Sequence, residues 1–144
     1  VASAPRPRGD EVAGVDAKSY FVLKERVGVG SFGTVYRALA GAARAPVAIK
    51  VIDLDGSVEE LEDVRRELEL LSTANDCEQL VRYLGAHVVE RRQLWIAMEF
   101  MEGGSLGGLM ASKVACPAGR LSEHAVGGVV REVLAALAYL HGER

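Results

Sequence analysis

A glycine-rich segment followed by a lysine in an apolar strand constrains this chain more than any other feature. Residues 27–36 read VGVGSFGTVY, so Gly28, Gly30 and Gly33 have the spacing G-x-G-x-x-G, and residues 47–50 read VAIK. Glycine has no Cβ, so its backbone can adopt unusual dihedral angles and approach a polyphosphate closely. A lysine on a rigid strand supplies the opposite charge. Together the two segments predict a site that grips nucleotide phosphates.

The same glycine spacing occurs in dinucleotide-binding folds, which place an acidic residue about twenty positions after the last glycine. Asp53 stands at that distance from Gly33. In a dinucleotide fold, however, the third glycine opens a helix, whereas Thr34, Val35 and Tyr36 are β-branched or aromatic and favour a strand. We therefore expect the glycine segment to form a hairpin tip, and a dinucleotide-binding domain is the least favoured alternative.

The pattern of apolar residues predicts an α+β fold with a five-stranded antiparallel sheet and one helix. In the third strand Ala48, Lys50 and Ile52 should share one face, because side chains alternate along a strand. A capping box of Ser57 and Glu60 should open the helix, which runs for about fourteen residues. The expected strands cover residues 20–27, 34–39, 47–54, 80–89 and 93–100.

Two helices are expected after the fifth strand. Ser105 is placed to cap a short helix or to touch a ribose, and capping is the better supported role. Gly107 and Gly108 should weaken that short helix. The second helix, over 121–141, should begin at the N-cap Ser122, because apolar residues then recur at three- and four-residue spacing.

Composition narrows the class of protein. The chain has 144 residues, 49% hydrophobic and 26% charged, with a formal net charge of -3. That charge argues against a general nucleic-acid binder, since affinity for a phosphate backbone requires a basic surface. No apolar run approaches the roughly 18 residues of a membrane span. Cys77 and Cys116 are expected to be free thiols in a reducing compartment, so we expect an intracellular, cytoplasmic protein.

The order of these segments resembles that of eukaryotic-type protein kinases. The stretches VAIKVIDLD, ELEDVRRELELL and QLWIAMEFMEGGSL are similar to those of the sterile-twenty-like (germinal-centre) serine/threonine kinases. The resemblance begins at Tyr20 and continues through residue 144. Residues 1–18, which show no periodicity, are expected to form a flexible leader. The resemblance implies a kinase small lobe and hinge over 19–101, and the start of a large lobe over 102–144.

The resemblance also implies which residues bind ATP. Lys50 and Glu67 would form an ion pair that holds the lysine toward the α- and β-phosphates. Met98 would be the gatekeeper, and Glu99 to Met101 the hinge whose backbone groups bond the adenine. The full set expected to contact ATP is Val27, Gly28, Val29, Gly30, Ser31, Phe32, Gly33, Thr34, Val35, Ala48, Lys50, Met98, Glu99, Phe100, Met101 and Ser105.

The distribution of aspartate and asparagine limits the chemistry of this chain. Asp76 is the last aspartate and Asn75 the only asparagine. Phosphoryl transfer requires an aspartate to orient the attacking hydroxyl, and an aspartate and an asparagine to hold magnesium. We therefore expect no metal site and no activity in this chain alone, with truncation before the catalytic loop. The catalytic base and magnesium ligands would lie elsewhere in the parent protein.

Two functions of the parent protein stay open at this point. The first is an ATP-dependent serine/threonine kinase that phosphorylates protein hydroxyls. The second is a pseudokinase or nucleotide-sensing binding module that also lacks the catalytic aspartates. Downstream H-R-D-x-x-x-x-N and D-F-G motifs would support the first. Lys50 and Glu67, both present, favour the enzyme.

Overall fold

The described part of the protein forms two compact units. The computed structural model describes residues 15–30, 33–54, 68, 72, 74–112, 116 and 119–142. The first unit comprises the described residues up to Asp76 together with Val81–Phe100, and the second comprises Cys77–Leu80 and the described residues from Met101 onward. The chain thus passes from one unit to the other directly after Phe100.

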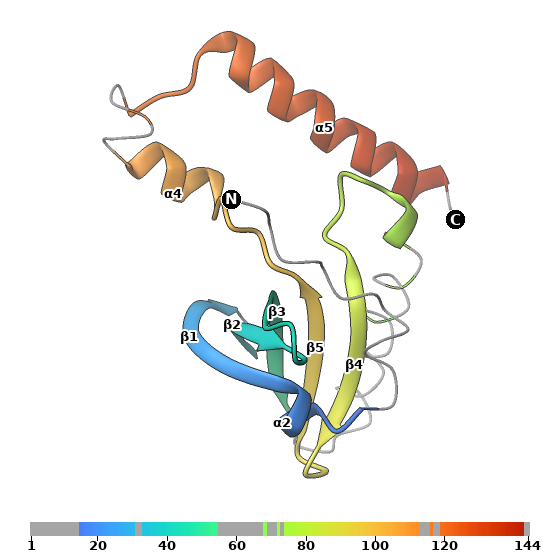
Figure 1. The fold of residues 1–144 in the computed structure, drawn as a ribbon. Helices are drawn as coiled ribbons and strands as arrows, with labels where there is room; N and C mark the ends of the chain where they lie inside the picture. The colour runs from blue at the N-terminus through green and yellow to red at the C-terminus, as the bar shows by residue number, and fades with distance from the viewer. Residues whose placement is uncertain are drawn as a thin grey trace. The chain divides into compact units, whose positions relative to one another are not determined.

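A five-stranded antiparallel sheet forms the first unit (Figure 1), which confirms the predicted fold class. The strand order is β1-β2-β3-β5-β4. Strand β1 continues to Gly30, beyond the predicted end at Val27, because Gly28 pairs with Val35 and Gly30 with Gly33. The strands are β1 (Phe21–Gly30), β2 (Gly33–Ala40), β3 (Ala45–Asp53), β4 (Tyr83–Val89) and β5 (Gln93–Glu99).

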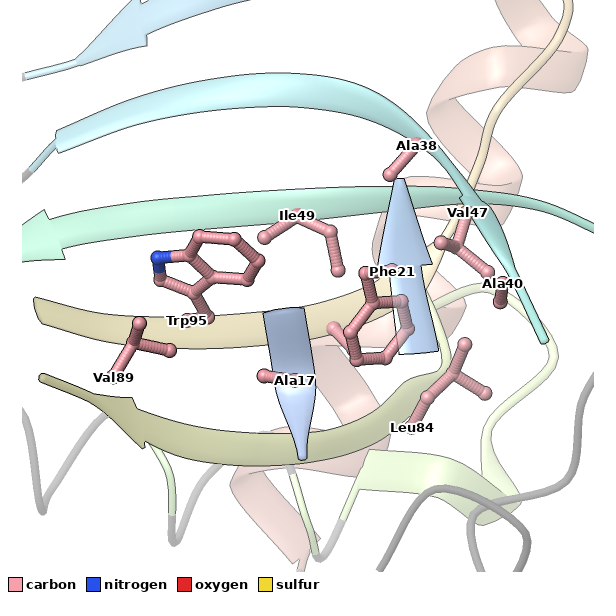
Figure 2. Packing of buried hydrophobic residues seen from close by; sticks show 10 residues of the cluster. Ala17, Phe21, Ala38, Ala40, Val47, Ile49, Leu84, Val89 and Trp95 are labelled. Atoms are coloured by element: carbon pink, nitrogen blue, oxygen red, sulfur yellow. The ribbon is translucent and has the colours of Figure 1, made fainter. Parts of the chain in front are cut away.

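The two faces of the sheet carry separate apolar clusters, as the alternation in β3 predicted. We call them the Ile49 face and the Lys50 face after two neighbouring residues of β3. Buried side chains on the Ile49 face gather beside α2 (Ala17–Tyr20), as Figure 2 shows. They comprise Ala17, Phe21, Ala38, Ala40, Val47, Ile49, Leu84, Val89, Trp95 and Ala97. The Lys50 face has a smaller cluster of Ile52, Leu94 and Ile96, with Leu54, Leu68, Tyr83, Ala86 and Met98 packed against it.

A short helix precedes the sheet. Helix α2 (Ala17–Tyr20) packs on β1 and β4, and the Ala17 side chain is buried in the cluster of the Ile49 face. Lys18 forms an ion pair with Glu90 in the turn after β4. Ala17 and Lys18 fall in the range that the sequence assigned to a leader, but their apolar packing and charge pairing tie them to the sheet.

The helix predicted from Ser57 falls almost entirely outside the described residues. Leu68 and Ser72 are helical, and Leu68 packs on the Lys50 face. Glu67 and Glu60 lie outside the described ranges, as does Ser57. The ion pair between Lys50 and Glu67 therefore stays a prediction.

A side-chain amide links a short turn to the fourth strand. The turn η1 (Ala74–Asp76) contains Asn75, whose Nδ2 donates to the carbonyl of Tyr83 at 3.0 Å. The Asn75 Oδ1 accepts from the Tyr83 N–H at 2.8 Å. The amide thereby satisfies both backbone groups of the first residue of β4.

The second unit contains two helices with side-chain caps. Helix α4 (Leu106–Ala111) begins after Ser105, whose Oγ accepts from the Gly108 N–H at 3.0 Å. Helix α5 (Glu123–Gly142) follows Ser122, whose Oγ accepts from the Ala125 N–H at 3.2 Å. Both predicted caps are confirmed, and α4 is short where the sequence places two glycines.

Helix α5 leaves a row of apolar side chains exposed on its unit. Within the described residues, Ala136 is its one buried position. The exposed large side chains are Val126, Val129, Val130, Val133, Leu134 and Leu137. By length and composition alone, α5 is long and apolar enough to cross a membrane, and helices in the cores of soluble proteins pass the same test. Gln79 Nε2 donates to Glu132 Oε2 at 3.2 Å and so joins Cys77–Leu80 to this helix.

Candidate nucleotide-binding site

Strand pairing brings the predicted lysine and its neighbours onto one face of the sheet. Lys50 of β3 stands opposite Val35 of β2 and Ile96 of β5. Ala48 is paired with Met98 in the next row on the same face. Directly opposed residues point to the same side of a sheet. Val35, Ala48, Lys50 and Met98 therefore share the Lys50 face, although they come from three strands.

The glycines of the hairpin differ in what surrounds them. A Cβ built on Gly28 or Gly30 would meet no atom closer than 3.9 Å. Gly33 has φ +138°, and a Cβ there would lie 2.2 Å from the carbonyl oxygen of Val51. Gly33 is thus required by the fold, because β2 packs against the β3 backbone at that point. Gly28 and Gly30 have room for a side chain, so their lack of one leaves the backbone open to a ligand.

The remaining residues of the hairpin divide between the two sides. Val29 and Thr34 are paired with each other, one step beyond the pair of Gly28 and Val35. Successive side chains alternate, so only the backbones of Val29 and Thr34 can face a ligand on the Lys50 face. Val27 lies in an irregular part of β1, between the pairs of Arg26 and Gly28. Ser31 and Phe32 lie outside the described residues.

The predicted hinge is held by the strands beside it. The Glu99 N–H donates to the carbonyl of Arg82 at 2.9 Å, and the Arg82 Nε lies 4.0 Å from a carboxylate oxygen of Glu99. Phe100 follows, with the Arg37 guanidinium carbon 5.6 Å from its ring centroid. These contacts hold the Glu99 backbone and the Phe100 side chain, which belong to the segment that would meet an adenine.

The last two predicted site residues belong to the second unit. The Met101 carbonyl accepts from the Gly104 N–H at 3.0 Å, which closes the turn after the hinge. The Ser105 Oγ is the acceptor for the N-cap bond of α4. A hydroxyl that accepts one bond can still donate its proton, so the cap and a ribose contact are compatible.

Two arginines near the site were missed by the sequence analysis. Arg37 is opposite Ala48, so it lies on the Lys50 face, and it follows Val35 by two positions. That spacing within a predicted strand was a signal that the two share a face. No comparable signal indicated Arg82, because its contact with Glu99 depends on the pairing of β4 with β5.

Two ionisable side chains of β4 have pKa values that burial shifts. Burial raises the pKa of the Tyr83 phenol and lowers the pKa of His87. His87 is paired with Trp95 on the Ile49 face, and its Nε2 has no hydrogen-bond partner among the described residues. Within the described ranges, no three His, Cys, Asp or Glu side chains group as metal ligands would.

The strand after Gly33 rules out the dinucleotide-binding alternative. Thr34, Val35 and Tyr36 lie in β2, where a dinucleotide fold would open a helix. Asp53, the acidic residue at the expected distance, ends β3 and bonds the Gln93 side chain at 2.8 Å. The hairpin predicted from β-branched and aromatic residues is confirmed.

Comparisons with known proteins agree with this arrangement. Serine/threonine-protein kinase sid1 of Schizosaccharomyces pombe is 38% identical over 129 residues, which cover 90% of this chain and 26% of that protein. Serine/threonine-protein kinase dst1 of Dictyostelium discoideum is 37% identical over 126 residues, which cover 88% of this chain and 16% of that protein. Serine/threonine-protein kinase 10 of Mus musculus is 37% identical over 130 residues, which cover 90% of this chain and 13% of that protein. The chain therefore spans about a quarter or less of each of these relatives.

A family model confirms the resemblance found in the sequence. The model described as the protein kinase domain matches residues 21–144, which include the whole sheet and both helices of the second unit. The homologues are serine/threonine kinases, sterile-twenty-like kinases among them. This chain belongs to the protein kinase family.

Proposed function

We propose that this chain is the ATP-binding part of a serine/threonine protein kinase that transfers the γ-phosphate of ATP to protein hydroxyls. The observation that carries the proposal is the gathering of Val35, Ala48, Lys50 and Met98 on one face of the sheet to which the glycine hairpin also belongs. The names of the relatives, each a serine/threonine kinase, support the reaction class.

Each group has a distinct part in the proposed complex. The Lys50 ammonium attracts the α- and β-phosphates, and Glu67 holds it there. Gly28 and Gly30 let the hairpin backbone approach the phosphates, since neither position carries a side chain. Ala48 is 7% exposed and small, so it leaves room for the adenine ring beside Met98. The backbone of Glu99 to Met101 bonds the adenine edge, and a contact of Ser105 with the ribose stays a prediction from the sequence.

The proposal places magnesium and the catalytic base outside residues 1–144. No aspartate or asparagine follows Asp76 in this chain, and phosphoryl transfer of this type uses those residues. Magnesium would neutralise phosphate charge when bound. We expect the 144-residue chain alone to transfer no phosphate and to bind ATP weakly or not at all.

The proposed setting is the cytoplasm, with ATP and a protein substrate as partners and with no nucleic acid. Cys77 and Cys116 are free thiols, as expected in a reducing compartment. We interpret α5 as a helix of the kinase domain and not as a membrane span, because the family match includes it.

The test compares the full-length protein with two lysine variants. Lys50→Met should lower the rate of radiolabelled phosphate transfer to a generic protein substrate by about a hundredfold or more, the usual cost of losing a charge-stabilising group. Lys24→Met, an exposed lysine of β1, is the matched control and should transfer at the normal rate. ATP binding without transfer would indicate a nucleotide-sensing module. Absence of both binding and transfer would refute the proposal.

A further inference from the structure

Arg37 connects three segments of the first unit through its guanidinium group. Its Nη1 donates to Glu25 Oε1 at 3.3 Å, so the group is paired with β1. The guanidinium carbon lies 5.6 Å from the centroid of the Phe100 ring, in the geometry of a cation–π contact. Because Arg37 itself belongs to β2, one side chain joins both strands of the hairpin to the hinge.

The position of Arg37 in the sheet determines what this connection controls. Arg37 is two residues from Val35, and Val35 stands opposite Lys50. A displacement of β2 relative to the hinge would therefore move the hairpin relative to both the lysine and the adenine segment. The side chains of Arg37 and Glu25 are 37% and 59% exposed, so the contact is accessible to solvent and can open without unfolding the sheet.

The Glu25 carboxylate supports this geometry. A backbone hydrogen bond and then the charge of Arg37 lower the pKa of Glu25, so it stays ionised at neutral pH. A planar guanidinium can bond a carboxylate at its edge and stack an aromatic ring on its face. Lysine, whose charge is a compact ammonium on a flexible stem, cannot do both in this way.

We propose that Arg37 is a positioning residue for the nucleotide, because its contacts with Glu25 and Phe100 hold the glycine hairpin at a fixed distance from the hinge. The inference rests on the proposed function, since it presumes that the Lys50 face binds ATP. Arg37 itself touches no reacting atom in this proposal. It acts by preorganising the hairpin, and loss of preorganisation weakens binding without changing the groups that contact the ligand.

The experiment is a double-mutant cycle on the full-length protein, with ADP in the presence of magnesium as the probe. Arg37→Met keeps the length of the side chain and removes its charge, and Phe100→Leu removes the ring. Each should raise the Kd for ADP about two- to fivefold, the factor that an exposed cation–π contact represents. The double variant should be no weaker than either single variant, because both remove the same contact.

Two further measurements separate positioning from a purely structural role. Arg37→Met should raise the KM for ATP with little change in kcat, and it should speed amide exchange in the hairpin while exchange in β5 stays unchanged. Arg26→Met is the matched control: Arg26 is opposite Tyr36, on the other face, and its variant should bind ADP normally.

The outcomes distinguish this inference from the proposed function. A wild-type protein that binds no ADP would refute both. A wild-type protein that binds ADP, with Kd unchanged in Arg37→Met or with additive effects in the double variant, would refute the role of Arg37 alone.

Discussion

Gly33→Ala should destabilise the fold, whereas Gly28→Ala should not, although both glycines belong to the same motif. The cost at Gly33 has two sources. Its φ of +138° lies where residues with a Cβ are rarely found, and holding such a conformation costs about 1 to 3 kcal/mol. The new Cβ would also lie 2.2 Å from the Val51 carbonyl oxygen. That overlap requires a backbone shift, and overpacking of this kind costs about 1 to 3 kcal/mol.

The two contributions together predict a loss of about 2 to 6 kcal/mol for Gly33→Ala, a large part of the 5 to 15 kcal/mol that stabilises a typical domain. At Gly28 the φ is not positive and the nearest atom would be 3.9 Å from the Cβ, the Val35 Cβ. Alanine there should leave the free energy of unfolding unchanged or raise it by up to about 1 kcal/mol, because alanine lowers the conformational entropy of the unfolded chain. Its effect should be confined to nucleotide affinity.

The assay is thermal unfolding of the full-length protein together with amide exchange in β2 and β3. Gly33→Ala should lower the Tm by several degrees and speed exchange around Thr34 and Val51, which are paired beside it. Gly28→Ala should neither lower the Tm nor speed exchange, but it should raise the Kd for ADP. Equal losses of stability in both variants would refute the assignment of separate roles to the two glycines.

Two further predictions concern residues outside the proposed site. Burial lowers the pKa of His87, so the unfolded chain takes up a proton at a higher pH than the folded chain. The contribution of neutral His87 to the free energy of unfolding is fully present above the pKa of about 6.5 that histidine has in the unfolded chain. It is lost as pH falls from there toward the pKa of His87 in the folded protein. His87→Leu should flatten the dependence of Tm on pH below about 6.5, and an unchanged slope would contradict this account. Asn75→Ala removes two hydrogen bonds to Tyr83 and should cost about 1 to 3 kcal/mol in urea unfolding. Asn75→Asp, which keeps the acceptor for the Tyr83 N–H, should lose about half as much stability as Asn75→Ala. Equal losses in the two variants would show that the bond from the Tyr83 N–H contributes nothing.

Local patterns predicted the strands and the faces of the sheet. Alternation placed Ala48, Lys50 and Ile52 together, and β-branched residues after Gly33 identified a strand where a helix was the alternative. These features depend on neighbours within a few positions, so the sequence contains them directly.

Contacts between distant segments were not predictable in the same way. The separate role of Gly33 depends on the Val51 carbonyl, and the cation–π contact of Arg37 with Phe100 joins residues far apart in the chain. No periodicity encodes such pairs, because they follow from the register of whole strands. Helix α2 was missed for a related reason: one buried alanine, Ala17, and one charge pair give no periodic signal.

The strand order has a consequence for how the first unit forms. Strands β1, β2 and β3 follow one another as hairpins, and β4 and β5 form another hairpin, so each of the five strands pairs with a neighbour in sequence. Only the pairing of β3 with β5 joins the two groups, and it closes a long stretch of chain. Closing this loop lowers the entropy of the chain before the contacts between β3 and β5 can stabilise the sheet. The seam where Ile49 meets Ala97, both fully buried, is therefore where the two hairpin groups become one cooperative sheet.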